Sequence, residues 1–480
     1  MLATERLVSS GAAQPNQQPK PKRKWHTTAW LYKEVDRRRC LRTITPTLLE
    51  PSGQPVTSGG EVAVLGTFCW TPEREVRVPS REPIFQHVAL PAVLPPVGKP
   101  RGMIPSGRAM RRPQRGNKAG GVNSKLKASE TGKPEPATAT AAAAAADANA
   151  MPPHSLAPLA QAIATMSPSH RLRGTDLVVQ RNSLRKLFAL CGGQNPDSFR
   201  VGLQLVRDKT LVVTKQDMLT WHPSATRASG VGLSFERLFT RAAEPGREGD
   251  QSHHRVISYD LGGLRCVVQF EVDACYYDGG EGKMATGSEA DDAARGGLTI
   301  EEKLLALSLE PPTLADTTPP PTAAATAAPA PVVLDSAGAA PQSTVAEMKT
   351  CNAGKRQSRL SGALPQLWFG RTPWFIQGRR EGNAVTVVDV TDVTRRFADW
   401  EERHQETLRR LVTLVCELRD SVRAAGPGCK HCVLVYDRAE QDERVDGEPQ
   451  QRVVRIYRAN VPKAKEPIPR DLVERLWGPD

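Results

Sequence analysis

Two pairs of charged residues, with one residue between the members of each pair, have side chains that could form a metal site. Glu271 and Asp273 stand in the segment FEVDA, and Glu347 and Lys349 stand in AEMKT. Residues two apart on a β-strand project from the same face, so each pair predicts two charged side chains facing one cleft. Carboxylates this close repel each other unless a cation lies between them. Ligation by oxygen alone favours Mg²⁺ or Mn²⁺, held by Asp273 and Glu347, with Lys349 beside the water that attacks a phosphodiester.

A Glu-x-Lys pair has a simpler alternative interpretation. Such pairs occur by chance on ordinary strands, where the two side chains face solvent and form a cross-strand ion pair. The order of several motifs favours the metal site instead. An acidic residue, a long gap and Glu-x-Lys follow the general pattern of PD-(D/E)xK nucleases.

The elements around these residues predict one α/β domain, with a central mixed β-sheet flanked by helices. Alternating apolar residues indicate strands, and apolar residues at helical spacing indicate helices. The expected strands are 199–206, 210–215, 254–261, 264–277, 384–390, 432–437 and 452–459, and the expected helices are 176–191 and 395–422.

The composition predicts that much of the 480-residue chain builds no core, since it holds 40 Pro, 38 Gly and only 5% aromatic residues. We expect residues 1–170 to be mostly disordered, with a short ordered strand island at 61–96. A disordered Pro- and Ala-rich insert is expected at 278–342, and residues 171–277 and 343–480 then form the single nuclease-like domain. Loop-closure entropy grows only logarithmically with length, so such an insert can separate the two acidic motifs without unfolding the domain.

The positive charge is concentrated in the first part of the chain. Residues 1–135 hold 23 Lys and Arg against 10 Asp and Glu, which accounts for the whole net charge of +13. Basic clusters at 20–24, 36–40 and 108–118 lie among Pro, Gly and Ser. They predict a flexible arm that contacts RNA phosphates, and a solvated tail without a partner is the alternative. The cluster at 20–24 also fits a nuclear import signal.

The cysteines and the apolar runs limit the class of protein. Nine Cys without regular spacing, and no signal peptide at the start, predict reduced thiols in the nucleus or the cytoplasm. No apolar run reaches the roughly 18 residues of a membrane-spanning helix. The CKHC segment at 429–432 is half a zinc motif without a second half, and SHH at 252–254 has no partnered nucleophile motif, so a structural role is favoured for both.

From about residue 172 to 400, the chain resembles the DXO family of decapping exonucleases, a branch of the PD-(D/E)xK nucleases. The family's upstream Arg, its Gly-apolar-x-x-Glu motif, its Glu-apolar-Asp and its Glu-apolar-Lys appear in order as QRNSL with Arg181, GLSFE ending at Glu236, EVD and EMK. The segment QLWFGRTPWFIQGRR keeps the spacing of the family's Gln, Pro and Gly-x-Arg, with Gln366, Pro373, Gly378 and Arg380.

This resemblance implies a metal-dependent nuclease or an RNA 5′-end processing enzyme, with decapping, pyrophosphohydrolase or exonuclease activity. It implies that two metal ions are bound by Glu236, Glu271, Asp273 and Glu347, with Lys349 beside the attacking water. It further implies that the phosphates of an RNA 5′ end are held by Arg181, Gln366 and Arg380. The chain departs from the family at Arg379, where the middle residue of Gly-x-Arg is normally apolar, and this departure bears on 5′-end specificity.

A second hypothesis is a non-catalytic RNA-binding or scaffold protein that retains the nuclease-like fold. The enzyme is favoured, because a scaffold has no reason to keep a cluster of mutually repelling carboxylates. In either case the expected partner is RNA, and the helix near the C-terminus is a candidate surface for a protein partner.

Overall fold

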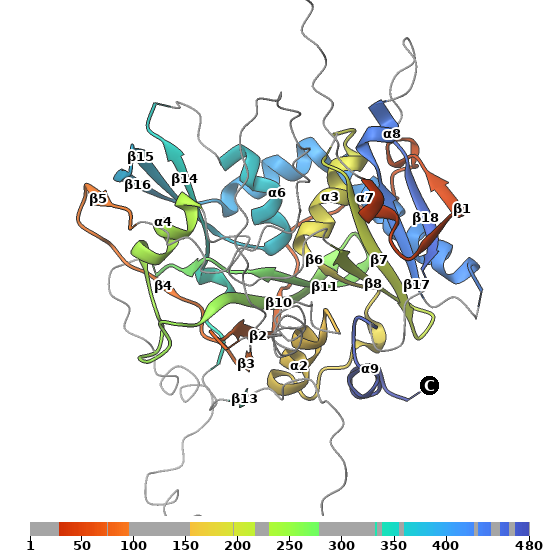
Figure 1. Ribbon diagram of the computed structural model, residues 1–480, viewed down its shortest axis with the longest axis horizontal. Helices are drawn as coiled ribbons and strands as arrows, with labels where there is room; N and C mark the ends of the chain where they lie inside the picture. Colours follow the sequence, from red (N-terminus) through yellow and green to blue (C-terminus); the bar gives the residue numbers. More distant parts are fainter. Residues whose placement is uncertain are drawn as a thin grey trace, which may run out of the picture.

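The computed structural model describes residues 28–73, 75–95, 154–194, 196–216, 230–277, 332–333, 338–354, 360–426, 431–442, 452–459 and 466–479. These residues form two mixed sheets with helices packed against them (Figure 1). The α/β class with helix-flanked mixed sheets is therefore confirmed, although two sheets take the place of one. The basic clusters at 20–24 and 108–118 lie outside the described residues, and so does the expected insert except for 332–333 and 338–342.

The larger sheet has eleven strands among the described residues, and its central strands are buried on both faces. The sequences of such strands are nearly continuous apolar runs, as in LVV at 177–179 in the centre of this sheet. In spatial order the strands are β1 (Val35–Ile44), β18 (Val454–Ala459), β17 (His431–Tyr436), β7 (Phe199–Val206), β8 (Thr210–Gln216), β6 (Leu177–Gln180), β11 (Leu264–Glu271), β10 (Gln251–Leu261), β2 (Ala63–Trp70), β3 (Val76–Val78) and β13 (Val332–Val333).

The smaller sheet carries the Glu-x-Lys motif on its central strand. Within the described part of the chain its strands, in spatial order, are β5 (Ala92–Val93), β16 (Ala384–Asp392), β15 (Trp374–Glu381), β14 (Val345–Asn352), β12 (Ala274–Cys275), β4 (Ile84–Phe85) and β9 (Thr240–Arg241). Strand β14 runs parallel to β15 and antiparallel to β12.

Helices cover both faces of the larger sheet (Figure 1). One face packs on α3 (Arg181–Cys191), α6 (Leu360–Gly370) and α7 (Phe397–Ala424), and the other packs on α2 (Ala157–Met166) and α9 (Arg470–Trp477). The smaller sheet packs on α4 (Val231–Phe239). None of the helices in the described ranges has the length and apolar character needed to span a membrane.

Two predicted elements have different boundaries in the structure. The expected helix 176–191 begins only at Arg181, because residues 177–180 form β6, which pairs with β11 and β8 in the core of the sheet. Here the β-branched pair of valines follows its strand propensity instead of the helical spacing. The expected strand 264–277 is broken after Glu271, and the chain continues as β12 in the other sheet.

The N-terminal region contributes more to the fold than the predicted island at 61–96. Strand β1 pairs with β18, and β2 pairs with β10. The short helix η1 (Thr28–Tyr32) packs Leu31 and Tyr32 on strands β17 and β18. The basic cluster at 36–40 therefore lies on an ordered edge strand, not on a flexible arm.

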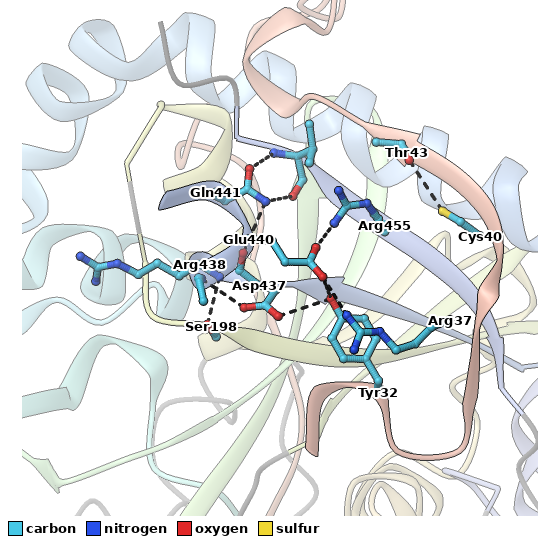
Figure 2. Close-up of polar contacts among 12 residues, drawn as sticks. Tyr32, Arg37, Cys40, Thr43, Ser198, Asp437, Arg438, Glu440, Gln441 and Arg455 are labelled. Atoms are coloured by element: carbon cyan, nitrogen blue, oxygen red, sulfur yellow. Dashed lines mark hydrogen bonds and ion pairs between the residues drawn. The ribbon is translucent and has the colours of Figure 1, made fainter. Parts of the chain in front are cut away.

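Polar contacts join the start of β1 to the short helix α8 (Arg438–Asp442) (Figure 2). Tyr32 donates its hydroxyl proton to Glu440 at 2.7 Å, and Arg37 pairs with the same carboxylate at 3.0 Å. Arg455 on β18 contacts the other oxygen of Glu440. One carboxylate thus links the N-terminal strand to the C-terminal part of the sheet.

His253, from the SHH segment, is partly buried at the start of β10, and its environment makes the protein sensitive to acid. Ser80 Oγ lies 2.8 Å from its Nδ1, and burial lowers the pKa of the imidazole to about 4. In the unfolded chain the pKa is about 6.5. Below pH 6.5 the unfolded chain therefore binds a proton that the folded chain does not, so the free energy of unfolding falls as the pH falls toward 4.

We expect this histidine to remove about 2 kcal/mol of stability between pH 7.5 and pH 5. Urea unfolding at both pH values should show a smaller loss in His253→Gln than in the wild type, because glutamine does not titrate. Equal losses in the two proteins would show that His253 is not the group responsible.

Candidate active site

Strand β14 presents Glu347 and Lys349 on one face and buries Met348 on the other, as the spacing predicts. The Glu347 side chain is 2% exposed and that of Lys349 is 31% exposed, whereas Met348 belongs to the core formed with α4. The two charged side chains form an ion pair with each other. Because the carboxylate is almost fully buried, such partners offset the hydration that it loses.

Asp273 reaches this pair from the point where the chain crosses between the sheets. Strand β12 pairs with β14, so that Ala274 lies opposite Ala346, and this places Asp273 beside Met348. The Asp273 carboxylate accepts a hydrogen bond from the Met348 backbone N–H at 3.0 Å, and Lys349 Nζ lies 3.8 Å from it. The ammonium group of Lys349 therefore lies between the carboxylates of Asp273 and Glu347.

The sequence argument predicted this meeting but for a partly wrong reason. Glu271 ends β11 and Asp273 lies beyond it, so the two residues do not share the face of a single strand. The neighbour of β14 is the short strand β12, not β11. Glu271 still borders the site, because its backbone carbonyl accepts a hydrogen bond from Arg181 at 3.4 Å, and its Oε1 is buried.

The surroundings of Lys349 place a further carboxylate within electrostatic range. Burial alone would lower the pKa of this lysine, but Asp273, Glu347 and, more weakly, Glu236 together raise it above its ordinary value. Lys349 is consequently a cation at neutral pH. Glu236 is thus brought to the same region as the other acidic residues.

The position of Glu236 depends on a close contact between α4 and β15. Phe235, the preceding residue on α4, packs directly over Gly378 on β15, where an added Cβ would lie only 2.5 Å from the ring. Only a residue without a side chain allows this approach. The glycine of the Gly-x-Arg segment is therefore required by this close packing, a role that the sequence alone did not reveal.

We expect Gly378→Ala to move α4 away from β14 and, with it, Glu236. The overpacking should cost about 1–3 kcal/mol of stability. Combining it with Phe235→Leu, which removes ring atoms at the contact, should recover part of that loss, as measured by urea unfolding. If the alanine variant alone is as stable as the wild type, the contact does not fix α4.

Arg181 is held rigidly at the start of α3. Its guanidinium donates to Glu347 Oε2 at 3.2 Å and lies 5.0 Å from the centre of the Phe270 ring. Gly370, at the end of α6, faces this side chain, because an added Cβ would lie 3.0 Å from Arg181 Nη1. The side chain is only 10% exposed, unlike that of an ordinary solvent-facing arginine on a helix.

Gln366 on α6 connects the two sides of the cluster. Its Nε2 donates to Glu347 Oε1, and its Oε1 accepts from Arg185 Nη1 at 3.1 Å. Sequence reasoning missed Arg185, although a signal was present. Residues four apart on a helix lie on the same side, so Arg181 on α3 implied that Arg185 lies next to it.

Arg380 is not brought to this cluster. On β15, Phe375 lies opposite Glu347, and Arg380 lies opposite Asn352. Arg380 is therefore five residues, or about 16 Å, along the strand from the position beside Glu347. Its guanidinium donates to the Gly382 carbonyl at 2.6 Å. Since Gly378 faces α4, alternation turns Arg380 to that side as well, and Arg379 shares the face of Lys349 instead.

The donor set suits a hard divalent cation, since its members, Glu236, Glu271, Asp273 and Glu347, supply carboxylate oxygens alone. In the described parts of the chain, no three acidic, histidine or cysteine side chains are arranged to hold a metal ion as they stand. The cation between Asp273 and Glu347 is the ammonium of Lys349. A metal ion at this position would require the lysine side chain to turn aside.

Comparison with known proteins identifies a family. A family described as a domain of unknown function (DUF8563) matches residues 38–477. The chain belongs to this family. No curated protein matches the sequence.

Among solved structures, similarity is found to Rai1 and Dxo1 proteins of yeasts. Rai1 of Scheffersomyces stipitis is 10% identical with a TM-score of 0.49, covering 90% of this chain and 97% of that one. Candida albicans Rai1 in complex with pU5 and Mn²⁺ is 11% identical with a TM-score of 0.47, covering 90% and 98%. Dxo1 of K. lactis with manganese is 7% identical with a TM-score of 0.41, covering 89% and 97%. Similarity at this level does not decide what this chain binds or catalyses, which rests on its own residues.

Proposed function

We propose that the chain is a divalent-metal-dependent phosphodiester hydrolase that acts on the 5′ end of RNA, by decapping, pyrophosphohydrolysis or exonucleolytic cleavage. One observation carries this proposal. A Glu-x-Lys pair on β14, with its glutamate buried, meets Asp273 at the crossing between the two sheets, and Arg181 and Gln366 both bond to the same glutamate. An ordinary solvated strand face has no reason to bury two carboxylates and a guanidinium together.

The four carboxylates Glu236, Glu271, Asp273 and Glu347 would hold Mg²⁺ or Mn²⁺. When bound, such a metal neutralises negative charge on a phosphate and makes water a better nucleophile. Lys349, a cation at neutral pH, would donate hydrogen bonds to the attacking water or to a phosphate oxygen. It is therefore an electrostatic group in this proposal and not the general base.

The remaining residues of the cluster would position the substrate. Arg181 is fixed by Glu347 and Phe270, so its guanidinium keeps one orientation without substrate and loses little entropy on binding a phosphate. Gln366 has its amide orientation set by Arg185 and Glu347. Arg380 has no such support from the cluster, and we assign it no part in this site.

An intracellular location, in the nucleus or the cytoplasm, completes the proposal. The eight cysteines in the described ranges are all free thiols, as expected in a reducing compartment. The basic residues of the first 135 positions would add phosphate contacts outside the cluster.

One observation favours the alternative of an RNA-binding protein without turnover. The ammonium of Lys349 takes the place between the carboxylates that a catalytic cation would occupy. If this ion pair does not open, the site binds RNA through its guanidinium groups and does not cut it.

The proposal is tested with the full chain and end-labelled RNA carrying a cap, a triphosphate or a monophosphate. Incubation with Mg²⁺ or Mn²⁺ should release labelled 5′ products, and EDTA should stop the reaction. RNA binding without cleavage of any of the three substrates would establish the non-catalytic alternative.

A further inference from the structure

Two arginines of α3 lie one helical turn apart on the side that faces the cluster. Arg181 donates to Glu347, and Arg185 donates to Gln366, which in turn donates to the same glutamate. Both guanidinium groups are therefore tied to one carboxylate, directly or through one amide.

The two guanidinium groups share one carboxylate, Glu347, so this arginine pair carries one more positive charge than the carboxylate that binds it. Burial and the charge of Arg181 lower the pKa of Arg185, and only Glu347 acts in the opposite direction. Arg181 Nη1 and Arg185 Nε are buried and have no hydrogen-bond partner among the described residues. Buried donors without partners are costly, as are like charges held together, so both features indicate an anion that would bind between them.

We propose that Arg185 is a second phosphate-binding residue of this site and that it contacts an RNA phosphate together with Arg181. The inference rests on the proposed function, because it takes RNA as the ligand of the same cluster. Two planar guanidinium groups side by side match the several oxygens of one phosphate, and charge-assisted hydrogen bonds of this kind are among the strong ones. The phosphate can be the 5′-terminal one or one within the chain.

A purely structural role for Arg185 is the competing account. In that case the guanidinium only holds the amide of Gln366 toward Glu347, and RNA never touches it. The two accounts differ in the salt dependence of binding, because only a direct phosphate contact releases a counterion from the RNA.

The test measures binding of full-length protein to short single-stranded RNA by fluorescence anisotropy, with Ca²⁺ in place of Mg²⁺ to suppress turnover. Arg185→Met should raise Kd about tenfold or more and reduce the log-log salt slope by about 0.7, the value for one phosphate contact on a single strand. Arg185→Lys should restore the slope. The matched control is Lys186→Met, which removes the same charge from the neighbouring position. The Lys186 ammonium lies 5.0 Å from the centre of the Phe199 ring. This control should leave the salt slope unchanged.

Two further experiments distinguish the remaining interpretations of the binding data. RNA with a 5′-phosphate and RNA with a 5′-hydroxyl distinguish the sources of the phosphate: an effect on the first alone indicates the terminal phosphate, and an effect on both indicates an internal one. In a Gln366→Ala background, Arg185→Met should still weaken binding if the contact is direct. No further loss there, or a wild-type slope in Arg185→Met, would overturn the inference. Absence of cleavage by the wild type would overturn the proposed hydrolase but leave the binding result interpretable.

Discussion

Asp273→Asn should lower metal-dependent RNA hydrolysis by about 10³-fold while leaving RNA affinity unchanged or slightly higher. The substitution keeps the shape of the side chain and its hydrogen bond from the Met348 backbone. It removes one charge from the proposed metal site and a repulsive charge near the phosphates, so the loss should fall on turnover and not on binding. Single-turnover cleavage and Kd should be measured on the same RNA.

The matched control for this substitution is Asp389→Asn on β16. It makes the same chemical change in the same sheet, at an exposed residue paired with Arg379. It should leave cleavage at the wild-type rate. Loss of RNA affinity in Asp273→Asn equal to the loss of turnover would contradict a role in chemistry and indicate a general disturbance of the site.

Glu82→Ala should destabilise the fold by about 3–5 kcal/mol, the largest effect on stability that we expect from a single substitution. Glu82 lies in the segment before β4, and its carboxylate pairs with Arg255 on β10 at 2.6 Å, with both side chains fully buried. Arg255 also donates to Gln342, whose amide donates to the two carbonyls at the end of α6 and just after it. Removing the carboxylate leaves a buried guanidinium without its counter-charge, where the smaller sheet meets the larger one.

Urea unfolding measures this effect against two reference variants. Glu474→Ala removes one partner of an exposed ion pair with Arg470 and should cost no more than about 0.5 kcal/mol. Replacing both buried partners, as in Glu82→Leu with Arg255→Met, should recover much of the loss, because no uncompensated charge remains. A loss in Glu82→Ala no larger than that in Glu474→Ala would show that the buried pair does not stabilise the junction.

The sequence predicted those parts of the fold where periodicity and turn residues agree. The hairpin at Gly262-Gly263 forms as expected, since both glycines have positive φ angles that suit its tight turn. The helix expected at 395–422 is α7, and its apolar stripe is buried along its length. In both cases a local pattern is sufficient, because it specifies the face that must leave water.

Other features depend on contacts distant in the sequence. The crossing from β11 to β12 brings Asp273 beside β14, and no local pattern distinguishes such a crossing from a continuous strand. The edge strand β1 is exposed along most of its length and owes its place to pairing with β18, more than 400 residues away. Arg185 could have been proposed from its helical spacing, but its bond to Gln366 could not.

The candidate site likewise combines features that a local sequence pattern predicts with features that depend on distant contacts. The order of the acidic motifs predicted that Asp273 and Glu347 meet, and the structure places Lys349 between them. The spacing of Gly-x-Arg predicted Arg380 as a further member, but strand alternation turns it to the other side of the sheet. Motif spacing identifies residues, whereas the side that each one faces is set by the register of the strands.

Binding of Mn²⁺ tests the central claim most directly, because it does not depend on turnover or on the choice of RNA end. Electron paramagnetic resonance of free Mn²⁺, titrated with the full-length protein and a short RNA, reports the ion that is bound. The account predicts that the wild-type protein depletes the free signal and that Glu347→Gln, which removes the carboxylate bonded to Lys349, Arg181 and Gln366, largely abolishes this depletion. Depletion by Glu347→Gln equal to that by the wild type, or no depletion by the wild type, would contradict a metal site at this cluster.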